Sequence, residues 1–438
     1  MDNYQNNLLD CTHLVALNPK WSLIDFSSRV QQIRQQLEQD KIQKVALWIE
    51  DASQFTCVLL ACLNTNCTVL LPPNLLPENK QWIDENADVF ITSTQFNTYG
   101  ILQKIEQIQP LVDKNNPTEI WLKTSGSSGN AKIIKKTAKQ MWKEAEILSQ
   151  ILPFDRGNHI GILGSVSVQH LYGLTFRIFL AIEMGWILGR EQLQYPEYLI
   201  AESYHYPQVI WISSPTLLTN LNIDNIKVNN LTGVISSGGV LHNHIGNHLR
   251  ERLQIPLVEI YGSTETGAIA FRQDDQLWQS LPESTIGLNN DGVLWVESAW
   301  ISQREQTADA IEINQNGFQL LGRSDRIVKL GDKRVSLVRI EQDLLSHPWV
   351  IDCYIAIHPE KHRPVAWVAL SEEGINTLKQ NARKDLIENL KQHLMQTQER
   401  FTLPRFWRFC LRLPRNSQSK IQRKDFEKVC FAQQDEIN

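Results

Sequence analysis

The sequence predicts an α/β fold in which a large N-terminal domain is built from parallel sheets flanked by helices. Short apolar runs, such as KVALWIE (44–50) and VIWIS (209–213), are typical of strands buried on both faces. They alternate with segments of helical periodicity, such as 139–152 and 171–184. Repeated strand–helix alternation indicates parallel strands that are joined by crossover helices.

The pattern of the sequence changes after Asp274. The segments GVLWVES (292–298) and GFQLLG (317–322) alternate apolar and polar residues, which predicts a small antiparallel subdomain. Further short apolar runs and a helical stretch at about 375–398 predict a small α+β domain at the C-terminal end. We place the boundary between Ser324 and Asp325, which gives a large domain of residues 1–324 and a small domain of residues 325–438.

Composition and charge exclude several classes of protein. Of the 438 residues, 42% are hydrophobic and 21% are charged, which argues against a disordered, collagen-like or coiled-coil chain. The 43 Lys and Arg residues against 48 Asp and Glu give a net charge of −5, which excludes a generally basic nucleic-acid binder. The segment from Arg326 onward nevertheless holds 20 basic and 14 acidic residues, a net +6. This region would favour an anionic partner or would form a solvated face without one.

The cysteine pattern and the N-terminus predict a cellular compartment. Seven cysteines are scattered without a CxxC pair, which indicates buried, reduced thiols. The start MDNYQNNLLD lacks the charged and apolar regions of a signal peptide, and no run of 18 apolar residues follows. We therefore expect a soluble cytoplasmic protein without a transmembrane segment.

The segment WLKTSGSSGNAK (121–132) is the first chemical motif. Small hydroxyl residues between glycines let several backbone N–H groups face one anion, and Lys132 adds a positive charge. An exposed hairpin turn is the alternative for SGSSG alone. A P-loop requires Gly-Lys-Ser/Thr at the start of a helix, whereas Lys132 lies between Ala131 and Ile133 in a strand-like context. The sequence therefore predicts a phosphate-binding loop of another type.

The segment VEIYGSTETG (258–267) is the second motif. It offers Tyr261 for stacking, Thr264 for a phosphate and Glu265 for Mg²⁺, which suits a nucleoside triphosphate. The alternative is a strand followed by a helix that Thr264 caps.

Two further segments hold charged residues in regular frames. LLGRSDRIVKLGDKRVSLVRIE (320–341) follows the short segment TAD (307–309), and NSQSKIQR (416–423) contains Lys420 near the end of the chain. Alone, the first of these would be an exposed edge strand, and Lys420 would be an ordinary surface lysine.

Together and in this order, these motifs resemble those of the adenylate-forming superfamily, which includes acyl- and aryl-CoA ligases, peptide-synthetase adenylation domains and luciferases. The segments resemble the family's TSGTTGxPK loop, its YGxTE, its GRxDxxIKxxGxR and its terminal GK, and TAD stands where the family has TGD. SVQHLYGL (167–174) resembles HxYGL, and VISSGGVL (234–241) resembles SGGAPL. The resemblance covers nearly all of the chain from about residue 44.

The resemblance implies an enzyme that uses ATP and Mg²⁺ to convert a small carboxylic acid into an acyl-adenylate. The acyl group would then pass to the phosphopantetheine thiol of coenzyme A or of an acyl carrier protein. The rival functions are an amino-acid-activating domain and a catalytically weak regulatory protein that binds nucleotides. Amino acids are disfavoured because residues 161–176 contain no Asp or Glu to receive the substrate amine.

The resemblance also implies a role for each matching residue. The ATP phosphates would be held by Thr124, Ser125, Gly126, Ser127, Ser128, Gly129 and Lys132. Adenine and ribose would be held by Gly238, Gly239, Tyr261, Asp309 and Arg323. Thr264 would contact the α-phosphate, and Glu265 would bind Mg²⁺. Asp325 matches the hinge of a mobile C-terminal domain, which would present Lys420 for adenylation and Lys329 for thioester formation.

The acyl pocket is less well defined by the resemblance. His170 matches the gate beside the carboxylate, although a buried core histidine is the alternative there. The other pocket candidates are Tyr172, Ser213, Ser236 and Ile260, which weakly favour an aryl or medium acyl group. The basic tail favours a carrier protein slightly over free coenzyme A, on account of Arg405, Arg408, Arg412 and Arg415.

The chain departs from the family pattern at Ala131, Ala308 and Ser419, where the family has proline, glycine and glycine. Only 44 residues separate Glu265 from Asp309, and the segment before Lys44 is short. These short segments resemble a compact bacterial branch found beside type II fatty-acid-like and aryl polyene pathways.

Overall fold

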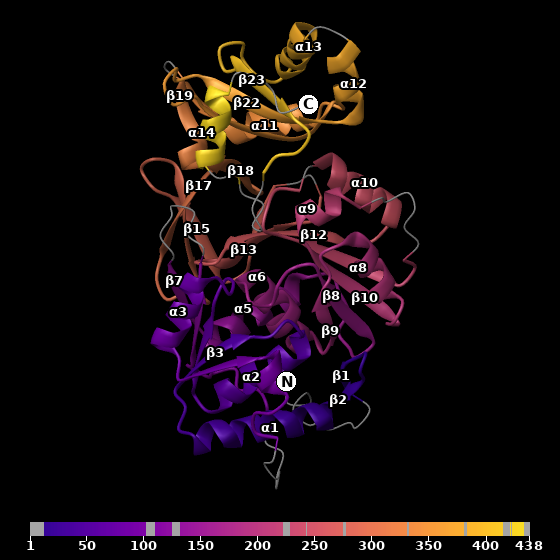
Figure 1. Ribbon diagram of the computed structural model, residues 1–438, viewed down its shortest axis with the longest axis vertical. Helices are drawn as coiled ribbons and strands as arrows, with labels where there is room; N and C mark the ends of the chain where they lie inside the picture. Colours follow the sequence, from indigo (N-terminus) through magenta and orange to yellow (C-terminus); the bar gives the residue numbers. More distant parts are fainter. Residues whose placement is uncertain are drawn as a thin grey trace. The chain divides into compact units, whose positions relative to one another are not determined.

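The computed structural model describes residues 13–101, 110–124, 132–221, 228–241, 243–274, 277–330, 333–380, 383–414, 421 and 423–432 (Figure 1). The mixed α/β architecture confirms the predicted fold class. The chain forms two compact units, Met1–Ile286 with Val296–Glu305, and Gly287–Trp295 with Gln306–Asn438. The boundary predicted between Ser324 and Asp325 marks the hinge of a mobile C-terminal domain, and it stays a prediction.

A five-stranded sheet holds the first strands of the larger unit, in the order β5-β3-β4-β6-β7. Its strands are β3 (Lys44–Trp48), β4 (Thr68–Leu71), β5 (Val89–Thr92), β6 (Glu119–Lys123) and β7 (Ile133–Thr137). All neighbouring strands run parallel except β6 and β7, which form an antiparallel hairpin. The accompanying helices are α1 (Leu23–Gln39), α2 (Ala52–Asn64), α3 (Pro77–Asn86) and α4 (Ser93–Phe96). Helix α2 is apolar around most of its circumference, and it is therefore buried.

A nine-stranded sheet forms the other layer of this unit, in the order β14-β13-β12-β11-β10-β8-β9-β1-β2. Its strands are β1 (Leu14–Ala16), β2 (Trp21–Ser22), β8 (Ile160–Gly164), β9 (Ile187–Gln192), β10 (Gln208–Ser213), β11 (Leu231–Ser236), β12 (Leu257–Ser263), β13 (Gly267–Arg272) and β14 (Gln279–Ser280). The central strands β9, β8, β10, β11 and β12 are parallel, as the apolar runs predict.

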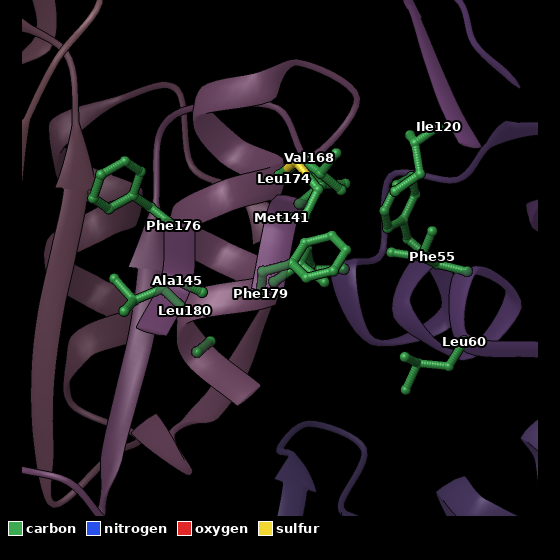
Figure 2. Packing of buried hydrophobic residues seen from close by; sticks show 14 of the residues in the cluster. Phe55, Leu60, Ile120, Met141, Ala145, Val168, Leu174, Phe176, Phe179 and Leu180 are labelled. Atoms are coloured by element: carbon green, nitrogen blue, oxygen red, sulfur yellow. The ribbon is translucent and has the colours of Figure 1, made fainter. Parts of the chain in front are cut away.

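The helices between these strands agree with the predicted periodic segments. They are α5 (Ala138–Ile151), α6 (Leu171–Gly173), a π-helix (Leu174–Phe179), α7 (Leu180–Met184), α8 (Pro196–Ser203), α9 (Pro215–Thr219) and α10 (Asn243–Leu253). One continuous hydrophobic core packs α2, α5 and the π-helix together. Figure 2 shows Phe55 of α2 on one side of this core and Met141 and Phe179 on the other.

A four-stranded sheet in the order β15-β16-β17-β18 follows, and β17 and β18 pair in antiparallel register. Its strands are β15 (Ser284–Leu288), β16 (Val293–Ser298), β17 (Glu305–Asn314) and β18 (Gly317–Arg323). The predicted antiparallel subdomain is therefore present.

The described residues of the C-terminal part form a hairpin, a three-stranded sheet and four α-helices. The strands are β19 (Ile327–Leu330), β20 (Lys333–Ser336), β21 (Val350–Ile357), β22 (Pro364–Leu370) and β23 (Phe406–Cys410). The helices are α11 (Leu337–Leu345), α12 (Glu372–Gln380), α13 (Arg383–Leu394) and α14 (Arg423–Phe431). The helical stretch predicted at about 375–398 is thus divided between α12 and α13. Within the described ranges, no helix is both long enough and apolar enough to cross a membrane.

Candidate active site

The carboxyl ends of four parallel strands meet at one edge of the nine-stranded sheet. Gly164 of β8 lies opposite Ile212 of β10, and Ser213 of β10 lies opposite Ser236 of β11. Ser236 in turn lies opposite Glu259 of β12. Ligands of open α/β sheets bind outside this edge. The structure therefore brings the segments that follow β8, β11 and β12 together, although they are far apart in the sequence.

His170 follows β8 at this edge and immediately precedes α6. Its side chain is exposed, so the alternative of a buried core histidine is wrong. The protein atoms around the imidazole lower its pKa by desolvation. A lowered pKa favours the uncharged ring at neutral pH, which suits contact with an apolar or aromatic group.

Tyr172, two residues after His170, connects two neighbouring strand ends. Its hydroxyl oxygen lies 2.9 Å from the carbonyl oxygen of Ser213 and 3.0 Å from that of Ile235. Burial raises the pKa of this hydroxyl, so it remains a neutral donor shared by two acceptors. Of the other pocket candidates, Ser213, Ser236 and Ile260 are buried in the sheet. His170 is thus the exposed member of the predicted acyl pocket.

The turn after β11 holds the two predicted adenine glycines. Both are exposed, and Gly238 has a positive φ of +85°, which favours glycine. Ser237 fixes the start of this turn, because its hydroxyl donates to the carbonyl oxygen of Ile260 at 2.8 Å. The glycine turn is thereby tied to β12, the strand that carries Tyr261.

Tyr261 is half-buried near the end of β12. Its ring centroid lies 5.7 Å from that of Trp278, with the ring planes tilted by 57°. The guanidinium of Arg272 lies 4.8 Å from the centroid of the Trp278 ring. The same guanidinium donates two hydrogen bonds, of 3.0 and 2.9 Å, to the carboxylate of Glu259. Trp278 therefore supports the predicted adenine-stacking residue, a role that no sequence motif indicates.

The second motif forms a tight turn between the antiparallel strands β12 and β13. The N–H of Ser263 donates to the Thr266 hydroxyl at 3.0 Å, and the N–H of Thr266 donates back to the Ser263 hydroxyl at 3.2 Å. Since β13 begins at Gly267, the alternative of a capped helix after Thr264 is wrong. Thr264 and Glu265 lie on this turn and are half-buried.

The first motif lies in the hairpin between β6 and β7. Ser125, Gly126, Ser127, Ser128 and Gly129 lie outside the described residues. The ends of the loop are described: the N–H of Thr124 donates to the carbonyl oxygen of Lys132 at 2.8 Å. A strand rather than a helix follows Lys132, which confirms that this motif lacks the geometry of a P-loop.

The remaining predicted residues lie in the C-terminal unit. Asp309 of β17 and Arg323 of β18 are direct cross-strand partners, which agrees with a shared ribose-binding role. Asp325 lies in a short 3₁₀ turn, and Lys329 pairs in register with Arg334. The side chains of Asp325 and Lys329, and the whole of Lys420, lie outside the described residues.

The predicted role of Glu265 as a ligand of Mg²⁺ is compatible with this arrangement. Across the described parts of the chain, no three His, Cys, Asp or Glu side chains gather into a metal-binding group. Mg²⁺ that is held mainly by nucleotide phosphates needs only one or two protein carboxylates. A half-buried Glu265 on the turn between β12 and β13 fits that requirement.

Sequence reasoning missed two buried charged residues beneath the turn. The ammonium of Lys136 donates to the carbonyl oxygen of Glu265 at 2.9 Å, and the carboxylate of Glu144 accepts the N–H of Ala268 at 2.7 Å. The only available signal was an adjacent Lys-Lys pair in a strand and a Glu among the apolar residues of an amphipathic helix. Neither pattern reveals a partner about 120 residues away.

Comparisons with known proteins agree with this fold and motif order. No protein-family model matches the chain. It is 29% identical over 311 residues to a 4-coumarate–CoA ligase of Halorhodospira halophila, a match that covers 68% of this chain and 74% of the relative. It is 23% identical over 345 residues to a 4-chlorobenzoate–CoA ligase of Arthrobacter, which covers 69% and 64%. The match thus spans less than two thirds of the second relative.

Two solved structures share the fold over nearly the whole chain. An anthranilate–CoA ligase in complex with anthranoyl-AMP superposes with a TM-score of 0.80 at 15% identity, covering 97% of this chain and 96% of that one. An o-succinylbenzoate–CoA synthetase of Bacillus subtilis superposes with a TM-score of 0.78 at 15% identity, covering 99% and 98%.

The sheets, the carboxyl-edge turns and the small C-terminal sheet define an adenylate-forming fold. The chain is similar in sequence and in fold to CoA ligases of the adenylate-forming superfamily, which agrees with the order of its motifs.

Proposed function

We propose that the protein activates a small carboxylic acid with ATP and transfers the acyl group to a phosphopantetheine thiol. A carboxylate oxygen would attack the α-phosphorus of ATP, and pyrophosphate would leave. A thiol would then attack the acyl carbonyl, losing its proton to solvent, and AMP would leave. The observation that carries this proposal is the meeting of His170, the glycine turn and the Tyr261–Glu265 turn at one strand edge.

The residues of this edge match the charges of the first half-reaction. A carboxylate and a triphosphate are both anionic, so their approach requires preorganised positive groups. Glu265 would hold Mg²⁺, whose charge would offset that of the phosphates. The loop from Thr124 to Lys132 would supply N–H donors, and Lys420 would supply an ammonium group.

The second half-reaction would follow a rotation about Asp325 that exchanges Lys420 for Lys329. Arg326 binds the segment that follows Asp325 to helix α11 and strand β21. The Arg326 guanidinium pairs with Glu341 of α11 and donates to the carbonyl oxygen of Ile355 in β21 at 2.9 Å. Because Arg326 is held in this way, a rotation would act at or before Asp325.

A carboxylic acid with an aryl or medium acyl group is the proposed substrate class. His170 is the exposed residue of the predicted pocket, and its lowered pKa favours an uncharged imidazole. The segment 161–176 contains no Asp or Glu that could bind the amino group of an amino-acid substrate. The relatives named above include ligases of 4-coumarate and 4-chlorobenzoate, which are aryl acids. The placement within a compact bacterial branch is a further proposal, which rests on the short segments of the sequence.

The thiol acceptor is proposed to be coenzyme A or a carrier protein. The relatives are named as CoA ligases, which supports coenzyme A. One argument for a carrier is weakened, because Arg408 points inward. Its guanidinium donates to the carbonyl oxygens of Val429, Cys430 and Ala432 at the end of α14. Arg405 and Arg412 are exposed, and Arg415 lies outside the described residues.

The deciding experiment is ATP–pyrophosphate exchange with a panel of aryl acids, fatty acids and amino acids. Exchange that depends on an aryl or medium acyl acid and on Mg²⁺ is the expected result. Exchange with amino acids alone would favour an amino-acid-activating domain. ATP binding without exchange for any acid would favour the regulatory alternative, and either outcome would overturn the proposal.

A further inference from the structure

Two charged residues are buried beneath the turn that carries Glu265. Lys136 of β7 is 3% exposed and Glu144 of α5 is 2% exposed. Charged side chains are almost never this deeply buried unless they are paired or hydrogen-bonded. Neither residue belongs to a motif that the proposed reaction uses, so their positions require another explanation.

Lys136 bonds to the main chain of Glu265 itself. Its ammonium donates to the carbonyl oxygen of Glu265 at 2.9 Å, and a longer contact of 3.4 Å reaches the carbonyl oxygen of Trp300. Strand β7 belongs to the five-stranded sheet, whereas Glu265 follows a strand of the nine-stranded sheet. One side chain therefore ties the proposed magnesium ligand to the other layer of the unit.

Glu144 holds the opposite end of the same turn. One of its carboxylate oxygens accepts the N–H of Ala268 at 2.7 Å. A Cβ atom at Gly267, whose φ is +70°, would lie 2.9 Å from both carboxylate oxygens and from Cδ1 of Trp300. The indole N–H of Trp300 also donates to the carbonyl oxygen of Ala268 at 3.1 Å. The turn thus passes between Glu144 and Trp300 with no space for a larger residue.

The two charges compensate each other in this buried place. Burial lowers the pKa of Lys136, and the nearby Glu144, Glu305 and Glu265 carboxylates raise it again. Burial raises the pKa of Glu144 to about 7, and Lys136 and the Ala268 N–H act in the opposite direction. Removal of Glu144 therefore weakens the compensation of the Lys136 charge, and removal of Lys136 weakens that of the Glu144 charge, whereas removal of both leaves neither buried charge in place.

We infer that Lys136 and Glu144 are positioning residues that fix the backbone of the Glu265 turn and so direct the Glu265 carboxylate toward bound Mg²⁺ and ATP. This inference rests on the proposed function for the role of Glu265. The alternative is that the pair only satisfies polar groups in the core. The two explanations differ in what happens when both charges are removed together.

The test compares Lys136→Met, Glu144→Gln and the double substitution with a matched control. Lys135→Met is that control, because Lys135 is the adjacent residue of β7 and its side chain is 53% exposed, with Nζ 3.7 Å from Glu119. Each variant is measured for its unfolding temperature, for the kcat of pyrophosphate exchange and for the Mg²⁺ concentration that gives half-maximal rate. Hydrogen–deuterium exchange of the amides of residues 263–268 is followed in parallel.

We expect each single substitution to lower the unfolding temperature and the double substitution to recover most of the loss. The kcat of the double variant should nevertheless stay roughly tenfold to a hundredfold low, because displacement of a reacting group by about 1 Å has that effect. Its Mg²⁺ requirement should also rise, while Lys135→Met resembles the wild type. Recovery of kcat together with stability would overturn the inference and leave only a structural role.

The hydrogen-exchange measurement separates this inference from the proposed function. If the wild type exchanges no pyrophosphate with any acid, the proposed function fails. Faster amide exchange at residues 263–268 in the double variant than in Lys135→Met would then still support the positioning of the turn. Equal exchange in both variants would overturn it.

Discussion

The rings of Tyr261 and Trp278 lie against each other with their centroids 5.7 Å apart, and Trp278 is almost completely buried. Such tilted aromatic pairs are favoured geometrically and add about 0.5–1.5 kcal/mol beyond burial. Tyr261 can therefore hold one orientation before any nucleotide arrives. Preorganisation of this kind improves affinity by reducing the ordering that binding requires.

Substitution of Trp278 tests this support. Trp278→Leu should raise the KM for ATP about threefold to tenfold, because a loss of about 0.5–1.5 kcal/mol corresponds to roughly that range. The kcat should change less, since Trp278 contacts no reacting group. A suitable control is Trp186→Leu, because Trp186 is also buried but precedes β9 at the opposite edge of the sheet. If both variants raise KM alike, the effect comes from general destabilisation.

Asp309 is predicted to bind the ribose hydroxyls. Asp309 lies opposite Arg323 in the register of the β17–β18 pair. Asp309→Ala should weaken ATP binding by about 1.5–3 kcal/mol, the usual contribution of hydrogen bonds to a charged group. Isothermal titration with a non-hydrolysable ATP analogue measures this directly. An unchanged affinity would mean that TAD is only a surface segment of β17 and takes no part in nucleotide binding.

Lys420 is predicted to serve adenylation but not thioester formation. Lys420→Ala should lower the adenylation rate by roughly 10²–10³, because it removes one preorganised charge from the transition state. The same variant should still convert a supplied acyl-adenylate and thiol into thioester and AMP. Both half-reactions are measured separately, and Lys424→Ala on the exposed start of α14 is the control. An equal loss in both half-reactions would contradict the two-state hypothesis.

The exposed basic residues of the C-terminal unit test the choice of acceptor. If a carrier protein docks there, Arg405→Glu with Arg412→Glu should slow transfer to the carrier and leave adenylation nearly unchanged. The effect should diminish with added salt, because exposed charges are screened over about 8 Å at physiological ionic strength. Free coenzyme A is the comparison substrate. A transfer rate that changes neither with added salt nor with the charge reversal would exclude carrier docking through these residues.

The sequence by itself determined the fold class and the chemical motifs, since these depend on neighbours in the chain. Apolar runs at strand spacing identified the parallel strands, and the order of small, glycine-rich segments identified the superfamily. Such features are local, so residues such as Tyr261, Glu265 and Lys132 could be selected from their immediate context. Their order along the chain then supplied the specificity that no single motif has.

Only the tertiary structure decided which residues support that site and which alternatives fail. Lys136 and Trp278 belong to no motif, and their roles follow from contacts between sheet layers and neighbouring strands. The exposure of His170 and the inward direction of Arg408 were equally undetermined by their neighbours in sequence. The physical reason is that burial and hydrogen bonding depend on how distant segments pack, and a one-dimensional pattern carries no record of that packing.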